Sequence, residues 1–249
     1  MEKLSHTEYK RLVADSDTAI LFVHGIVGTP NHFNTFIELV PDSISVYNIL
    51  LDGHGGSVKD FSKTSMSKWE EQVDKIVDEL LLSHKQLYIV AHSMGCLFAI
   101  EQAIKKPNIS KLFLLAAPIK LFLKPRMFIN SMKFYFNIIK EDDLVAVAAK
   151  NCCGLERTAN VFDYMRGAPR YIELFFKISK TKKFLPSLNT PCLAFQSLKD
   201  EMVSKKSIKL LQENPFVSVA ELSKSSHYYY DKDDFELLKT TFQKWINTK

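Results

Sequence analysis

A chain of 249 residues has room for one large domain with an insertion, and an apolar fraction of 46% is ordinary for a globular core. The net charge of +5 is scattered, and even the densest basic cluster, residues 177–183, lacks the alternation of basic and aromatic residues typical of nucleic-acid grooves. No apolar run approaches the ~18–20 residues of a membrane-spanning helix. These features argue against nucleic-acid binding and against stable insertion into a membrane.

The cysteines and the N-terminal segment indicate a cytoplasmic protein. Cys96, Cys152, Cys153 and Cys192 lack the paired spacing of zinc ligands, and the adjacency of Cys152 and Cys153 makes a structural disulfide between them improbable. Residues 1–17 are polar and charged, unlike a signal peptide. We therefore expect a soluble, cytoplasmic protein with reduced thiols and with no metal or other cofactor.

Strand and helix patterns alternate through most of the chain, which predicts a parallel sheet with helices on both faces. We expect strands at short apolar runs rich in β-branched residues, and helices where apolar residues recur every three or four positions. In chain order the expected elements are a strand at 18–23, a helix at 31–40 opened by Pro30, a strand at 44–50, a helix at 67–82, a strand at 87–91, a helix at 94–106 and a strand at 111–117.

Residues 120–185 interrupt this alternation, because no strand is evident between Pro118 and Pro191. The segment has a helical pattern, so we divide the chain into a core of residues 1–119 and 186–249 and a helical insertion of residues 120–185. Most aromatic side chains of the insertion are expected to pack it onto the core, and a minority to line an acyl pocket. They are Phe122, Phe128, Phe134, Tyr135, Phe136, Phe162, Tyr164, Tyr171, Phe175 and Phe176.

The most informative local pattern is a serine between the strand at 87–91 and the helix at 94–106. An abrupt turn from strand to helix lifts one side chain clear of the backbone, at the positive end of the helix dipole. The turn is crowded, so the residues two before and two after the serine must be small, and here they are Ala91 and Gly95. Ser93 is therefore the candidate nucleophile.

A nucleophilic serine needs a base, and the base needs an orienting carboxylate. A strand expected at 191–197 leads to Asp200, and a strand at 216–222 leads to His227, before an amphipathic helix at 233–247. Glu201 competes with Asp200, but neighbouring side chains in a turn point in different directions. We therefore expect Asp200 to orient His227.

Four segments carry a resemblance to a known family: residues 22–30 (FVHGIVGTP), 51–57 (LDGHGGS), 91–95 (AHSMG), and 200–203 (DEMV) together with 225–227 (SSH). They resemble the α/β-hydrolase fold serine hydrolases, and within these the small bacterial carboxylesterases and monoacylglycerol-lipase-like esterases. The departures are modest, since Ala91 replaces a more frequent glycine. The resemblance implies an α/β fold with a mostly parallel central sheet, helices on both faces and a small helical cap, here residues 120–185.

The resemblance also implies which groups would stabilise the oxyanion of a tetrahedral intermediate. One is the backbone N–H of Met94, directly after the serine, and the other is the backbone N–H of Ile26, in the loop after the first strand. Gly25 and Gly28 would let this loop approach the substrate closely.

Other histidines near these segments are expected to be structural. His92 adjoins Ser93, but consecutive side chains in the turn diverge. His24 is expected to hydrogen-bond within its own loop, and His54 to brace the turn after the strand at 44–50. A metal site of His24, His32 and His54 is conceivable, but its spacing fits no recognised ligand pattern.

These features together predict a serine carboxylesterase that hydrolyses short- to medium-chain esters through an acyl-enzyme, with monoacylglycerols among the candidate substrates. A lipase, thioesterase, perhydrolase or acyltransferase would share the triad of Ser93, His227 and Asp200. Two alternatives lack catalysis: a binding protein of the same fold, and an interaction module that docks through exposed aromatic side chains. The expected partner is a small-molecule ester, and the sequence leaves open a monomer or a homodimer.

Overall fold

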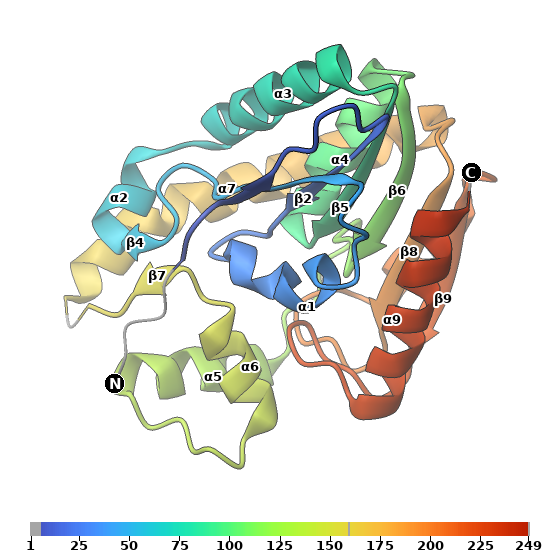
Figure 1. Ribbon diagram of the computed structural model, residues 1–249. Coiled ribbons are helices and arrows are strands. Elements are labelled where there is room, and N and C mark those ends of the chain that lie inside the picture. Colours follow the sequence, from blue (N-terminus) through green and yellow to red (C-terminus); the bar gives the residue numbers. More distant parts are fainter. Residues whose placement is uncertain (1–5, 159, 249) are drawn as a thin grey trace.

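A sheet of seven strands forms the centre of the protein (Figure 1). The computed structural model describes residues 6–158 and 160–248. The strands are β1 (Tyr9–Arg11), β2 (Thr18–Val23), β3 (Ser45–Asn48), β5 (Gln86–His92), β6 (Ile109–Leu115), β8 (Cys192–Ser197) and β9 (Val217–Leu222). They lie in the order β1-β3-β2-β5-β6-β8-β9, and every neighbouring pair is parallel except β1 with β3.

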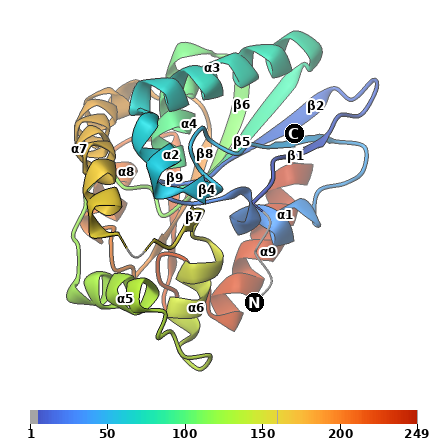
Figure 2. The same cartoon turned by 90° about the vertical axis from the view of Figure 1, so that its left-hand side faces the viewer.

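Helices cover both faces of this sheet (Figure 2). The helices of the core are η1 (Pro30–Phe33), α1 (Asn34–Ile37), α2 (Val58–Lys63), α3 (Met66–Ser83), α4 (Met94–Lys105), η2 (Leu185–Ser187), α8 (Lys206–Gln212) and α9 (Lys232–Asn247). Helices α3, α4 and α8 contribute to the hydrophobic cluster on one face, and α1 and α9 contribute to the cluster on the other. The expected mostly parallel sheet between two helical layers is confirmed.

Strand β2 shows why the sequence folds in this way. Its side chains alternate between the two clusters, with Leu21 and Val23 in one and Ile20 and Phe22 in the other. A strand covered on both faces buries its side chains on both, which explains the unbroken apolar run from Ala19 to Val23.

Two short pairings were not expected from the sequence. The first is β1, whose three residues pair antiparallel with β3 at the edge of the sheet. The second is a two-stranded parallel sheet of β4 (Gly56–Ser57) and β7 (Leu155–Glu156). The helix expected at 31–40 is also broken into η1 and α1.

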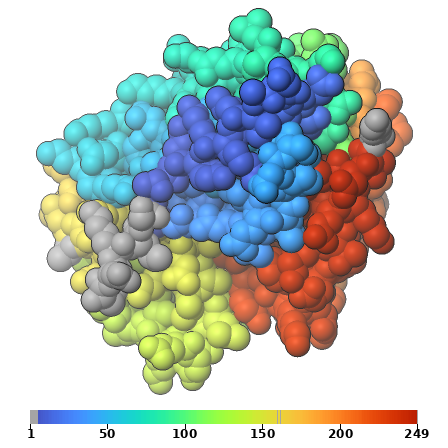
Figure 3. Space-filling model, in the orientation of Figure 1, coloured from blue at the N-terminus to red at the C-terminus, as the bar shows by residue number. Residues whose placement is uncertain are grey.

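The segment after β6 contains α5 (Pro125–Phe136), α6 (Leu144–Asn151), β7 and the long α7 (Val161–Phe184). Figure 3 shows its green to yellow part beside the red C-terminal region on the surface. A buried ion pair ties α7 to the core, because the Lys177 ammonium lies 2.7 Å from the Glu101 carboxylate on α4. The Thr181 hydroxyl donates to the same carboxylate at 2.7 Å.

The expectation that most aromatic residues of this segment pack onto the core is wrong. None of the ten is fully buried. Five line a pocket, namely Phe134, Tyr135, Tyr164, Tyr171 and Phe175. The other five do not line it and are exposed on the surface, as are Tyr171 and Phe175 of the first group; these five are Phe122, Phe128, Phe136, Phe162 and Phe176. Within residues 6–158 and 160–248, no helix is both long and apolar enough to cross a membrane.

Candidate active site

Ser93 occupies a strained turn between β5 and α4. Its backbone has φ 52° and ψ −122°, a left-handed conformation that costs energy for a residue with a side chain. Helix α4 begins directly after it and passes so close to β2 that a Cβ atom on Gly95 would lie 2.2 Å from the Val23 carbonyl oxygen. The small residue expected two positions after the serine is therefore required by this contact.

Ser93, His227 and Asp200 form a chain of hydrogen bonds across three loops at the carboxyl ends of the strands. The Ser93 Oγ lies 3.1 Å from Nε2 of His227, and Nδ1 of His227 lies 2.8 Å from Oδ2 of Asp200. All three residues are buried. The other carboxylate oxygen of Asp200 accepts from the backbone N–H groups of Met202 and Val203, at 2.7 and 2.8 Å.

Glu201 does not contact the His227 ring nitrogens, as expected, but it belongs to the same site. Its carboxylate accepts a hydrogen bond from the backbone N–H of His227 at 3.1 Å and is buried. Burial lowers the pKa of His227, but the charge and hydrogen bond of Asp200, together with the charge of Glu201, outweigh this effect. The pKa of His227 therefore lies above its ordinary value of 6.5.

The neighbouring histidines have the structural contacts expected of them. The His92 Nε2 lies 3.0 Å from the backbone oxygen of His227, so His92 helps to hold the loop of the candidate base. His24 contacts the Gly25 carbonyl oxygen through Nδ1, and its Nε2 accepts from the backbone N–H of Leu51. Burial and nearby histidines lower the pKa of His24 and His92, which keeps both rings neutral. The remaining histidine of this group, His54, braces its turn through Nδ1.

Ile26 and Met94 both belong to segments that lie next to Ser93. Met94 is the first residue of α4, so its N–H has no acceptor within the helix. Ile26 lines the same pocket as Ser93. The preceding loop residue, Gly25, packs so closely that a Cβ atom there would lie 2.8 Å from the Cβ of Ser93.

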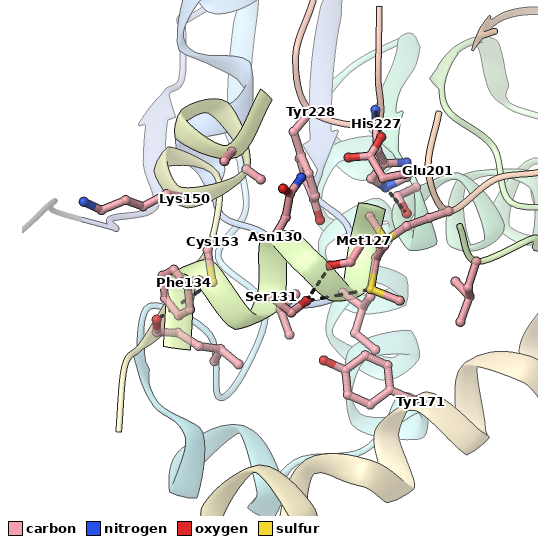
Figure 4. A pocket seen from close by; sticks show the side chains of 18 of the residues that line it. Met127, Asn130, Ser131, Phe134, Lys150, Cys153, Tyr171, Glu201, His227 and Tyr228 are labelled. Carbon is pink, nitrogen blue, oxygen red and sulfur yellow. Dashed lines mark hydrogen bonds between the residues drawn. The ribbon is translucent and has the colours of Figure 1, made fainter. Parts of the chain in front are cut away.

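A pocket of about 710 Å³ opens above Ser93 and His227. Its volume is that of a small-molecule site, and most of its walls are apolar. They come from the loop after β2, the loop after β6, helices α5, α6 and α7, and the segment at 201–203. Figure 4 shows side chains of α5 facing His227 and Tyr228 across this pocket.

The adjacent Cys152 and Cys153 are free thiols beside this pocket. Burial raises the pKa of Cys152 to about 12 and raises that of Cys153, so neither is a thiolate at neutral pH. The Cys152 sulfur lies 3.5 Å from Nδ1 of His32, and Cys153 lines the pocket. In the described parts of the chain, no group of three or more His, Cys, Asp or Glu residues is placed to hold a metal ion.

A model of the alpha/beta hydrolase family matches residues 20–230, which include Ser93, Asp200, His227 and every residue that lines the pocket. The chain belongs to the alpha/beta hydrolase family. One related sequence is the probable lysophospholipase BODYGUARD 4 of Arabidopsis thaliana, which is 33% identical to this hydrolase over 111 residues. That match covers 43% of the present chain and 26% of the plant protein.

Solved structures share the fold of this hydrolase at low sequence identity. One solved structure, from work on the metagenome-derived lipolytic enzymes LipS and LipT, gives a TM-score of 0.74 at 17% identity, over 97% of this chain and 97% of its own. The monoacylglycerol lipase of Paleococcus ferrophilus gives 0.69 at 17% identity, over 96% of this chain and 97% of its own. The monoglyceride lipase of Saccharomyces cerevisiae gives 0.69 at 14% identity, over 96% and 90%.

Proposed function

We propose that the protein is a serine carboxylesterase that hydrolyses short- to medium-chain carboxylic esters through an acyl-enzyme. The observation that carries this proposal is the hydrogen-bonded chain from Ser93 Oγ through His227 to Asp200. A serine hydroxyl is a poor nucleophile at neutral pH unless a base takes its proton during attack, and His227 Nε2 is placed to do this.

The proposed reaction has two steps. His227 takes the proton of Ser93 as Oγ attacks the ester carbonyl carbon, and then gives that proton to the leaving alkoxide as the carbon–oxygen bond breaks. A water molecule, activated by His227 in the same way, then hydrolyses the acyl-enzyme and restores Ser93. Asp200 keeps the proton on Nδ1 in the resting ring and stabilises the imidazolium formed in each step.

The backbone N–H groups of Met94 and Ile26 are the proposed oxyanion donors. Their positions beside Ser93 support this assignment, since Met94 opens α4 and Ile26 lines the pocket. Losing one such donor costs on the order of 10²–10³ in rate. The close packing of Gly25 against Ser93 holds the next residue, Ile26, near the serine, so this glycine would support catalysis as well as folding.

Residues 120–185 are the proposed cap that supplies the acyl pocket. Side chains from α5, α6 and α7 form much of the pocket wall, and most of that wall is apolar. A cavity of about 710 Å³ suits a short- to medium-chain acyl group together with its alcohol. The names of the related proteins, which are lipolytic enzymes, monoacylglycerol lipases and a probable lysophospholipase, agree with an ester of this kind.

Some alternative functions would use the same three residues for another reaction, and others would involve no catalysis. A lipase, thioesterase or acyltransferase differs only in the leaving group or the acceptor, and a thioesterase domain from the curacin biosynthetic pathway has the same fold with a TM-score of 0.62 at 16% identity. An interaction module would expose aromatic residues and have no pocket above Ser93. Exposed aromatic residues are present here, but so is the pocket, which favours catalysis.

The experiment that tests the proposal is fluorophosphonate labelling, followed by mass analysis, together with hydrolysis of p-nitrophenyl esters. The adduct should lie on Ser93, and Ser93→Ala should lower kcat by ~10⁴ or more with the fold intact. Labelling at another residue, or activity retained in the alanine variant, would contradict the assignment of the nucleophile. Absence of both labelling and turnover in the unaltered protein would favour a binding protein.

A further inference from the structure

A buried carboxylate on helix α9 holds the loop that carries His227. Asp234 lies in the first turn of α9, where the helix dipole favours negative charge. The cap of that helix is a different residue, Asp231, whose side chain accepts from the backbone N–H of Asp233 at 3.3 Å. The Asp234 carboxylate instead faces the segment between β9 and His227 and is buried there.

Three consecutive backbone N–H groups point at the Asp234 carboxylate. Those of Lys224 and Ser225 donate to Oδ2 at 2.8 and 2.9 Å, and that of Ser223 donates to Oδ1 at 3.3 Å. The Ser225 hydroxyl also donates to Oδ2, at 2.7 Å. Successive N–H groups of this kind form a site for an anion, which here is a side chain of the same protein. Burial raises the pKa of Asp234, but the hydrogen bonds from Ser225, Lys224 and Ser223 outweigh this effect and hold the pKa below its usual value.

Ser225 also joins the loop of His227 to the loop of Asp200. Its backbone carbonyl oxygen accepts from the N–H of Lys199 at 3.3 Å, and Lys199 directly precedes Asp200. Ser225 is completely buried and lies two residues before His227. The bond of 2.8 Å between Nδ1 of His227 and Oδ2 of Asp200 spans the same two loops. A shift of Ser225 would therefore change the distance between the candidate base and its carboxylate.

We propose that Asp234 is a positioning residue for the triad, because through Ser225 it fixes the distance between His227 and Asp200. This inference rests on the proposed ester hydrolysis. The hydrogen bonds at the His227 backbone act on that residue itself, whereas Asp234 acts on the segment that connects it to β9. Displacing a reacting group by about 1 Å can cost on the order of 10² in rate.

The test is steady-state hydrolysis of a soluble p-nitrophenyl ester by variants of Asp234. Asp234→Ala removes every acceptor for these donors and should lower kcat about 10- to 100-fold, with KM within about threefold because the pocket wall is unchanged. Asp234→Asn keeps one side-chain oxygen for Lys224 and Ser225 and should recover most of the loss. Asp233→Ala is the matched control and should change kcat by less than about twofold, because Asp233 is exposed and pairs with Lys224 on the surface.

A second variant of α9, Phe242→Leu, separates positioning from folding. Phe242 is buried in the hydrophobic cluster that α9 shares with the sheet, so its truncation should lower the thermal midpoint of unfolding and leave the His227 loop in place. At a temperature at which circular dichroism shows both variants folded, Asp234→Ala should lose kcat and Phe242→Leu should keep it. Equal losses in the two variants, or an unchanged kcat in Asp234→Ala, would overturn the proposal.

If Asp234→Ala does not fold, Ser225→Ala takes its place, because this change removes the hydroxyl contact and keeps the backbone contacts. It should lower kcat about threefold or more, relative to Phe242→Leu. A kcat equal to that of Phe242→Leu would assign the contact to folding and overturn the positioning role.

The proton on the His227 ring gives a second readout, which needs no substrate. Asp200 keeps this proton on Nδ1. At a pH above the His227 pKa, the ¹⁵N chemical shifts of the ring should therefore show the Nδ1 tautomer in the unaltered protein and in Phe242→Leu, and a mixture of tautomers in Asp234→Ala. If the unaltered protein hydrolyses no ester, ester hydrolysis is refuted, and this measurement still decides the positioning role. An Nδ1 tautomer retained in Asp234→Ala would overturn it.

Discussion

Replacing Asp200 by asparagine should abolish catalysis by placing the proton on the wrong nitrogen of His227. One oxygen of Asp200 accepts from the N–H groups of Met202 and Val203, and the other lies 2.8 Å from Nδ1 of His227. In Asp200→Asn the side-chain oxygen should keep the two backbone donors, which leaves the NH₂ group facing His227. Nδ1 must then act as an acceptor, and Nε2 carries the proton.

The opposite orientation of the asparagine is disfavoured by a clear margin. It would point the NH₂ group at two backbone N–H donors and leave both unpaired, at a cost of about 1–3 kcal/mol each. Moving the proton from Nδ1 to Nε2 costs His227 far less. The protonated Nε2 cannot accept the proton of Ser93, so kcat should fall by ~10⁴, equivalent to about 5.5 kcal/mol of transition-state stabilisation.

The assay is steady-state hydrolysis of a soluble p-nitrophenyl ester, with Glu201→Gln as the matched control. Glutamine at 201 can still accept the backbone N–H of His227, so its loss should be about tenfold or less. Circular dichroism should show both variants folded. A loss in Glu201→Gln as large as that in Asp200→Asn would refute the reasoning and make Glu201 the orienting carboxylate.

Further outcomes follow from the same geometry. The kcat/KM value should rise with pH through a midpoint above 6.5, because His227 must be neutral to act as a base and the charges of Asp200 and Glu201 raise its pKa against the effect of burial. Glu201→Gln removes one of these charges and should move the midpoint to lower pH. A midpoint that does not move would contradict this explanation. Gly95→Ala should lower the free energy of unfolding by about 3 kcal/mol, because the added Cβ would meet the backbone of β2. Gly56→Ala is the control and should change it little, since a Cβ there would lie 3.8 Å from its nearest neighbouring atom. Similar denaturation midpoints for the two variants would contradict the proposed contact. Activity should increase up to about fourfold for each CH₂ added to the acyl chain and fall once the pocket is full, while a flat profile would show that the pocket does not hold the acyl group.

Much of the fold and the candidate site could be predicted from local sequence patterns. The strand at Thr18–Val23 was predicted to the residue, and β5 and α4 to within one residue at each end. Ser93, Asp200 and His227 could be assigned to one site because each follows a parallel strand, and the carboxyl ends of such strands meet at one edge of the sheet. The hydrogen bonds between them agree with that reasoning.

Other features depended on contacts between distant segments. The three residues of β1 have no apolar pattern and form a strand only because the edge of β3 offers backbone partners. The aromatic residues of 120–185 have a helical period, but a period does not state what covers the helix, and seven of the ten are exposed. The expected packing was wrong for this reason.

Glu201 and Asn130 show the same limit most clearly. Sequence reasoning placed Glu201 pointing away from the candidate site, and nothing in its local pattern indicates that the loop after β9 brings the His227 backbone to it. Asn130 belongs to no sequence motif, and only the position of α5 places it in the wall of the pocket. The periodicity of the sequence thus determined the helices, the strands and the order of the reactive residues along the chain. The packing of residues 120–185 over the sheet decided which polar groups line the pocket. The sequence pattern could not give this packing, because it depends on contacts between segments far apart in the chain.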